Sequence, residues 1–171
     1  MPKTIYLLSG IPGSGKSTWA KNCVEFNKNS IYISRDEIRF SLLKENEDYF
    51  KHEKRVFKLF IEAINNALNE NFEDIYVDAT HINNASRNKV LRKLKGDFKL
   101  IHVIFKTDLV TCLKRNEKRV ERERVPEEVI RRFYTQFEMP KDGIINIVEN
   151  DVLVFSINTG KEKDNGYLFN C

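Results

Sequence analysis

Cysteines, histidines and long apolar runs are all scarce in this sequence. Cys23, Cys112 and Cys171 form no CxxC pair, and the three histidines show no ligand spacing, so neither a disulfide framework nor a zinc site is indicated. The longest apolar runs, such as residues 5–8 and 152–155, are far too short to span a bilayer. The first residues show no signal-peptide architecture. We therefore expect a cytoplasmic protein with no membrane partner.

Internal repeats, low-complexity tracts and linkers rich in proline or glycine are missing as well. A chain of 171 residues without such segments is expected to form one domain over residues 1–171, with a core that needs no disulfide. Its net charge of +4 is compatible with a polyanionic partner but does not diagnose one, and no aromatic platform for stacking bases is identifiable. The sequence leaves the oligomeric state open.

Short apolar runs alternate with helical patterns along the chain. This order predicts an α/β fold, with a mainly parallel sheet and helices on both faces, in which ligands bind beyond the carboxyl ends of the strands. A break before Pro126 favours a helical lid over roughly residues 112–126, and the polar segment over roughly 158–171 is expected to be peripheral. We expect strands at residues 3–8, 30–34, 74–80, 98–106, 143–149 and 152–158, and helices over 15–27, from Asp36, over 48–71 and 86–96, from Asp108 and from Pro126.

The segment GIPGSGKS, from Gly10 to Ser17, matches the phosphate-loop pattern GxxxxGK[ST] between an expected strand and an expected helix. Its glycines let backbone N–H groups point inward as an anion-binding nest, and the helix N-terminus adds its positive dipole end. Lys16 is expected to reach the β- and γ-phosphates of ATP or another NTP, with the Ser17 hydroxyl on Mg²⁺. Thr18 is either an α-phosphate contact or a simple first-turn residue. The expected nucleotide-binding residues of this segment are Gly10, Pro12, Gly13, Ser14, Gly15, Lys16, Ser17 and Thr18.

Two aspartates follow strand ends and are candidates for the chemistry. Asp78 comes at the end of the third expected strand, where phosphate-loop proteins place the acid that holds Mg²⁺. Asp36 follows the second strand, where it could accept the proton of an acceptor hydroxyl, and the metal role could also be shared or reversed between the two. The alternatives are an ordinary turn aspartate and an acid placed in a first turn by the helix dipole.

Polar and cationic side chains accompany these acids. Arg39 lies three residues after Asp36 on the same helix face, where it can bind an acceptor phosphate bidentately. Because the dipole disfavours a cation in a first turn, Arg39 is expected to have an anionic partner. Arg35 faces another way and could pair or hold a second phosphate. The loop after the third strand offers acceptor contacts or ordinary loop hydrogen bonds through Thr80, Asn83 and Arg87, with Asn84 or Ser86 as the cap of the next helix.

A basic segment follows the fourth strand. Arg115 and Arg119 are four residues apart and share one helix face, from which they could neutralise charge on the γ-phosphate. The interleaved glutamates leave open a solvated, salt-bridged face instead.

The segments GIPGSGKSTWA, SRDEIRFS, DATHINNASR, FKTDLVTCLKRNEKR and VPEEVIRRFYTQFEMP follow one another between about Lys3 and Pro140. Together they resemble the kinase domain of the 5′-hydroxyl polynucleotide kinase family, found in phage and bacterial nucleic-acid end-repair enzymes. Ala79 stands where the closest family pattern has an aspartate, and no phosphatase signature follows.

The resemblance implies transfer of the γ-phosphate of ATP to a 5′-hydroxyl end of DNA or RNA. It implies a general base at Asp36, an acceptor-phosphate contact at Arg39, γ-phosphate binding at Lys16 and Ser17, and lid contacts at Arg119 and Arg115. Two other interpretations are a kinase of a small hydroxyl compound, such as a sugar, nucleoside or antibiotic, and a nucleotide-binding module without an acceptor.

Overall fold

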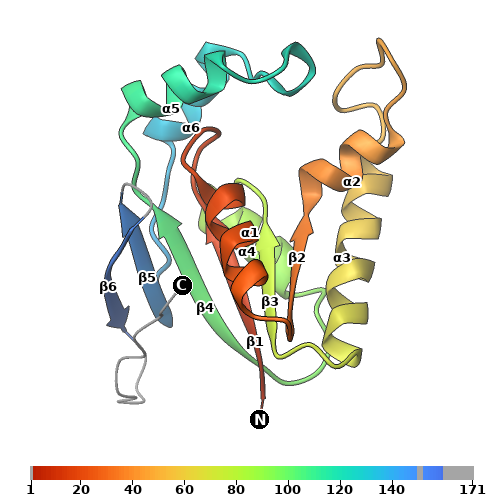
Figure 1. Cartoon of the computed structure of the whole chain (residues 1–171), viewed down its shortest axis with the longest axis vertical. Coiled ribbons are helices and arrows are strands. Elements are labelled where there is room, and N and C mark those ends of the chain that lie inside the picture. Colours follow the sequence, from red (N-terminus) through yellow and green to blue (C-terminus); the bar gives the residue numbers. More distant parts are fainter. Residues whose placement is uncertain (1, 150–151, 160–171) are drawn as a thin grey trace.

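A computed structural model describes residues 2–149 and 152–159, which are organised around a six-stranded sheet (Figure 1). The strand order is β2-β3-β1-β4-β5-β6, and neighbouring strands are parallel except β5 with β6. The expected α/β fold with a mainly parallel sheet is confirmed. The strands are β1 (Lys3–Ser9), β2 (Ser30–Ser34), β3 (Asp74–Asp78), β4 (Phe98–Phe105), β5 (Ile144–Glu149) and β6 (Val152–Asn158).

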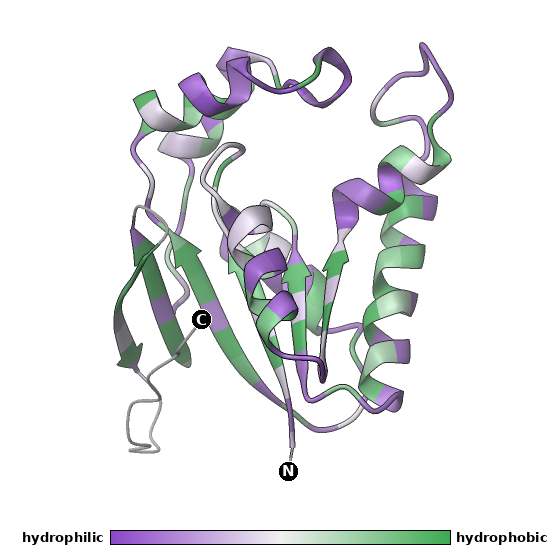
Figure 2. Ribbon diagram, viewed as in Figure 1, coloured by the Kyte–Doolittle hydropathy of each residue, from purple (hydrophilic) through white to green (hydrophobic). Residues whose placement is uncertain are grey.

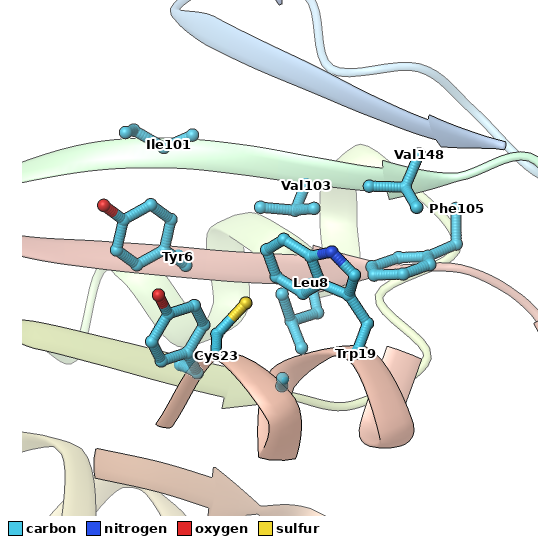
Figure 3. Close-up of a cluster of buried hydrophobic side chains, with 10 residues drawn as sticks. Tyr6, Leu8, Trp19, Cys23, Ile101, Val103, Phe105 and Val148 are labelled. Atoms are coloured by element: carbon cyan, nitrogen blue, oxygen red, sulfur yellow. The ribbon is translucent and has the colours of Figure 1, made fainter. Parts of the chain in front are cut away.

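Helices cover both faces of the sheet, and each face has its own core. On one face Tyr6 and Leu8 of β1 pack against Trp19 and Cys23 of α1 (Figure 3). On the other face Ile5 and Leu7 of β1 pack against residues of α3 and α4. Since β1 is buried on both faces, its sequence is a continuous apolar run, and Figure 2 shows the sheet mostly as hydrophobic residues. The helices are α1 (Lys16–Phe26), α2 (Arg35–Leu42), α3 (Glu53–Asn69), α4 (Asn84–Leu91), α5 (Leu109–Glu117) and α6 (Glu127–Thr135).

Two helices differ from the expected ranges. The helix expected over 48–71 is α3, which begins only at Glu53, because residues 48–52 form turns in which Asp48 accepts a hydrogen bond from the Phe50 N–H at 2.8 Å. The helix expected over 86–96 is α4, and its N-cap is Asn83 rather than Asn84 or Ser86. The Asn83 side chain accepts from the Ser86 N–H at 2.8 Å, and the Ser86 hydroxyl lies 3.3 Å from the Asn83 N–H, which completes a capping box.

The lid expected over roughly residues 112–126 falls within a helical segment of residues 109–135, and its motion as a lid stays a prediction. The chain leaves α5, makes a 3₁₀ turn at Glu121–Glu123 and returns through α6. Buried Asn116 joins α5 to the residues just before α6. Its amide donates to the Val125 carbonyl at 2.7 Å and accepts from the Val125 N–H at 3.0 Å. Figure 1 shows the segment above the carboxyl end of β1. Of the segment expected to be peripheral, residues 160–171 lie outside the described residues.

Within the described ranges, no helix is long and apolar enough to cross a membrane. The expectation of one domain over residues 1–171 stays a prediction.

We expect stability to fall on acidification, because burial lowers the pKa of both His81 and His102 to about 4. The unfolded chain binds these protons near pH 6.5, so this stability is present above pH 6.5 and is lost as the pH falls toward 4. Between pH 7 and pH 5 each histidine contributes a loss of roughly 2 kcal/mol. Urea denaturation should show that His102→Leu shrinks the pH dependence by about this amount. Equal slopes in the wild type and in His102→Leu would contradict the expectation.

Candidate active site

The phosphate loop lies at the edge of the sheet where the parallel strands end. It follows β1 and leads into α1, whose N-cap is Gly15 with a φ of +96°. Gly13 also has a positive φ, +84°, and a Cβ at this position would overlap the backbone carbonyl of Cys112 on α5. Thr107, which the sequence did not single out, donates from its hydroxyl to the Ser14 carbonyl at 2.8 Å. The positive φ angles of these glycines and the hydrogen bond from Thr107 therefore hold the loop in place beneath α5.

Lys16 is buried and folds over the loop. Its Nζ donates to the carbonyls of Gly10 at 2.8 Å and Ile11 at 3.0 Å, and to the Ser14 hydroxyl at 3.3 Å. Burial lowers the pKa of the Lys16 ammonium, while the negative charges of Asp78 and Asp36 act in the opposite direction.

A cavity of about 400 Å³ opens beside Lys16. The structure brings both candidate lid arginines to it, and Arg115 lies 3.5 Å from the Gly13 carbonyl. No described residue forms a hydrogen bond or an ion pair with the guanidinium of Arg119, which leaves that group available to an anion. Gly10, Pro12 and Ser14 shape the loop and are absent from the lining. The cavity is lined by Gly13, Gly15, Lys16, Ser17, Thr18, Arg115 and Arg119.

Ser17, Asp78 and Tyr32 meet at the floor of the cleft. The Ser17 hydroxyl and the Tyr32 hydroxyl each donate to Asp78 Oδ2 at 2.6 Å. Burial and then the charge of Asp78 raise the pKa of Tyr32, so its phenol stays a proton donor. A hydroxyl and a carboxylate oxygen beside a phosphate loop are the protein ligands that Mg²⁺ uses in such sites, with phosphates and water completing its shell. The pair Ser17 and Asp78 thus fits this metal.

Asp36 lies at the start of α2, directly after β2, and is not among the residues that line this cavity. Ser34 caps the helix by accepting from the Glu37 N–H at 3.2 Å. The Asp36 side chain is 58% exposed, and its Oδ1 accepts hydrogen bonds from Arg39 and from the Tyr49 hydroxyl, the latter at 2.8 Å. The carboxylate is thereby held by two donors while one of its sides stays open to solvent.

The anionic partner expected for Arg39 is supplied by the protein. Its guanidinium is buried, donates to Glu53 at 2.8 Å and lies over the Tyr49 ring at 4.2 Å from the centroid. Arg35 pairs with the same carboxylate of Glu53, so it forms an ion pair, as one of its two expected roles had it, but on the same side as Arg39. Partial burial acts to raise the pKa of Glu53, but the hydrogen bond from Arg39 and the charge of Arg35 bring it below its usual value.

Two of the three expected acceptor contacts have partners within the protein. Arg87 is only 1% exposed and donates to the carbonyls of His81 at 2.7 Å and Glu138 at 2.5 Å. Asn83 caps α4. Thr80 accepts from the Gly10 N–H at 3.0 Å through its backbone carbonyl, and a contact between its side chain and an acceptor stays a prediction.

Comparison with protein families agrees with this geometry. Residues 5–140 match the model of the family described as an AAA domain. The chain belongs to this family. The matched part of this AAA domain contains the phosphate loop, Asp36, Asp78 and both lid arginines, so the whole cleft lies within it. Its fold is that of phosphate-loop NTPases and kinases, which bind nucleotides.

Solved structures with low sequence identity share the fold of this AAA domain. A protein of the Pnkp1/Rnl/Hen1 RNA repair complex matches with a TM-score of 0.69 and 24% identity over 79% of this chain, which spans only 44% of that protein's length. Kti12 from Chaetomium thermophilum, in complex with ADP-AlF3, matches with a TM-score of 0.63 and 14% identity over 86% of this chain and 89% of its own. A gluconokinase from Sinorhizobium meliloti matches with a TM-score of 0.54 and 16% identity, over 86% of this chain and 82% of its own.

The substitution Gly13→Ala is expected to weaken nucleotide binding at least tenfold, about 1.4 kcal/mol. The new methyl group would collide with the backbone of Cys112 and strain a φ of +84°, which opens the loop. Titration calorimetry with a non-hydrolysable ATP analogue measures the affinity. Gly96→Ala is the matched control, because Gly96 has a φ of +88° with nothing within 4 Å of the added atom. This variant should lose stability but keep its affinity, and equal affinities of all three proteins would refute the role of Gly13.

Proposed function

We propose that this AAA domain transfers the γ-phosphate of ATP to the 5′-hydroxyl end of a polynucleotide, DNA or RNA. The observation that carries the proposal is the carboxylate of Asp36, which follows the carboxyl end of β2, is exposed and is held by Arg39 and Tyr49. In a nucleotide-binding module without an acceptor, Asp36 would serve only as a partner of Arg39. The sequence resemblance to 5′-hydroxyl polynucleotide kinases and the fold shared with an RNA repair protein support the choice of acceptor.

In the proposed reaction Asp36 accepts the proton of the terminal hydroxyl as its oxygen attacks the γ-phosphorus of ATP. The bond from this phosphorus to the bridging oxygen breaks, and ADP leaves. Lys16 and Arg119, together with Arg115, neutralise the charge that spreads over the phosphoryl oxygens. Bound Mg²⁺, for which Ser17 and Asp78 are the fitting ligands, would add positive charge on the phosphate oxygens.

The roles of the acceptor-side arginines are refined by their contacts. Arg39 keeps its proposed contact with the acceptor phosphate next to the reacting hydroxyl, but it also orients Asp36 through their ion pair. Arg35 supports it by sharing Glu53. Basic residues in the turn before α3 and in its first two turns can steer the strand electrostatically, in a manner that weakens with salt. They are Lys51, Lys54, Arg55 and Lys58.

Labelled-ATP transfer to a 5′-hydroxyl oligonucleotide tests the proposal. Asp36→Asn keeps the size of the side chain but removes the proton acceptor, so the rate is expected to fall by roughly 10²- to 10⁴-fold with little change in ATP affinity. Glu37→Gln is the control, since this neighbouring acid is exposed and pairs with Lys21 at 2.7 Å. It should retain activity.

The outcome against the proposal is a wild-type protein that labels no polynucleotide at any salt or metal concentration. Transfer to gluconate, another sugar, a nucleoside or an antibiotic in the same assay would instead support a small-molecule kinase. The gluconokinase that shares the fold gives that alternative its basis.

A further inference from the structure

Three aromatic rings lie side by side next to Asp36, although the sequence shows no aromatic platform. Phe40, near the end of α2, meets Tyr49 edge to face, with 6.2 Å between ring centroids and 68° between ring planes. Tyr49 meets Phe50 in the same way, at 4.9 Å and 84°. We call Phe40, Tyr49 and Phe50 the aromatic corner. Phe40 belongs to α2, and Tyr49 and Phe50 belong to the turns before α3, so the packing of these turns against α2 brings the three rings together.

The aromatic corner contacts Asp36 and Arg39 on one side and Arg122, from the segment between α5 and α6, on the other. The Tyr49 hydroxyl donates to Asp36 Oδ1 at 2.8 Å and accepts from Arg39 at 2.7 Å. On the lid side, Arg122 donates to the Phe40 carbonyl at 2.7 Å and lies over the Phe40 ring, 5.0 Å from its centroid. These contacts leave one aromatic group of the corner largely uncovered, the ring of Phe50.

Phe50 is 65% exposed, which is costly for a side chain whose full burial is worth roughly 1.5–3 kcal/mol in other settings. Single exposed apolar residues are common, and Phe26, 79% exposed at the end of α1, is such a case, with no ring contact among the described residues. Phe50 differs because it extends a row of rings that ends at the proposed general base. Of the acids that precede it, Asp48 accepts a hydrogen bond from the Phe50 N–H at 2.8 Å, and Glu47 is held by Lys51 and His52.

We propose that the aromatic corner binds the terminal nucleobase of the acceptor strand, with the base stacked on Phe50 against Tyr49. This inference rests on the proposed polynucleotide kinase function and adds to it a site for the base. The base and the 5′-hydroxyl are attached to the same sugar, so a base held by Phe50 beside Tyr49 keeps its hydroxyl near Asp36. Every base has a π-face that can stack. The site would therefore favour an end that carries a base over an end without one, and it would not distinguish between the four bases.

The same geometry favours an acceptor with a nucleobase over a small acceptor without an aromatic ring. A sugar alone has no π-face to stack on Phe50. An acceptor with a base gains both the stacking contact and the position beside Asp36. The aromatic corner therefore predicts a selectivity that the phosphate loop and lid arginines, which contact the donor nucleotide, cannot provide.

Two 5′-hydroxyl oligonucleotides that differ only in the terminal residue test the inference. One carries a normal nucleotide and the other an abasic tetrahydrofuran residue with the same 5′-hydroxyl. Wild type should prefer the normal end in kcat/KM on the order of tenfold, the size expected for one stacked base. Phe50→Ala should remove most of this preference by slowing only the normal strand, with the KM for ATP unchanged.

Two variants separate stacking from other effects. Phe26→Ala removes a ring that is even more exposed but remote from the corner, so it should keep the full preference for the base. Tyr49→Phe keeps the ring and removes the donor to Asp36, so it should lower kcat for both strands and preserve their ratio. A terminal 2-aminopurine should be quenched on binding to wild type and to Asp36→Asn, but not to Phe50→Ala, which reports stacking without turnover.

The outcomes distinguish this inference from the function on which it rests. If Phe50→Ala phosphorylates both strands with the wild-type preference, the base site is refuted and the kinase function stands. If wild type shows no preference between the two strands, the base site is refuted as well. If wild type transfers phosphate to neither strand, the proposed function fails and the base site falls with it.

Discussion

The parallel pairing of β3 with both β1 and β2 sets the position of the groups in the cleft. Asp78 is the register partner of Leu8 in β1 and of Ser34 in β2. Because parallel strands end at the same edge of a sheet, the acid of β3 lies between the phosphate loop that follows β1 and the helix that follows β2. Ser17 and Tyr32 then reach it from the two sides. Donor and acceptor sides of the cleft are joined at this single carboxylate.

The acceptor side depends on a second constraint, a buried guanidinium. Removing the charge of Arg39 from water is costly, and it is balanced by Glu53, Asp36 and the Tyr49 ring. Glu53 belongs to the first turn of α3, so these contacts tie α2 to α3 and fix the direction of Asp36. They also place the segment between the two helices where its aromatic residues lie next to the acid. A structural ion pair and the proposed chemistry thus share the same residues.

The donor side could be inferred from the sequence because its geometry is local. The pattern from Gly10 to Ser17 prescribes its own backbone shape, and the four-residue spacing of Arg115 and Arg119 places them on one helix face. The structure brings Lys16, Ser17, Arg115 and Arg119 to one cavity, and their roles in catalysis stay predictions. Asp78 could be inferred in the same way, because it is a polar residue at the end of an expected strand.

Side chains whose partners are remote in sequence were missed or misplaced. Arg87 was expected at the acceptor, but its partners include Glu138, 51 residues away, and it is buried as a structural donor. Tyr32 was treated as part of an apolar strand, yet its hydroxyl reaches Asp78 across 46 residues. Polarity alone does not tell whether a side chain will hold a loop or face a ligand, because both uses require hydrogen-bonding groups.

The sequence by itself determined the alternation of strands and helices, the shape of the phosphate loop and the presence of an acid and an arginine at the start of α2. These follow from interactions between residues near in sequence, such as periodicity, glycine conformations and capping. Only the tertiary structure decided that Arg39 is satisfied by Glu53, that Arg87 is buried, and that Phe40, Tyr49 and Phe50 gather beside Asp36. Those arrangements depend on which helices pack together, and packing is decided by the whole core rather than by any one segment.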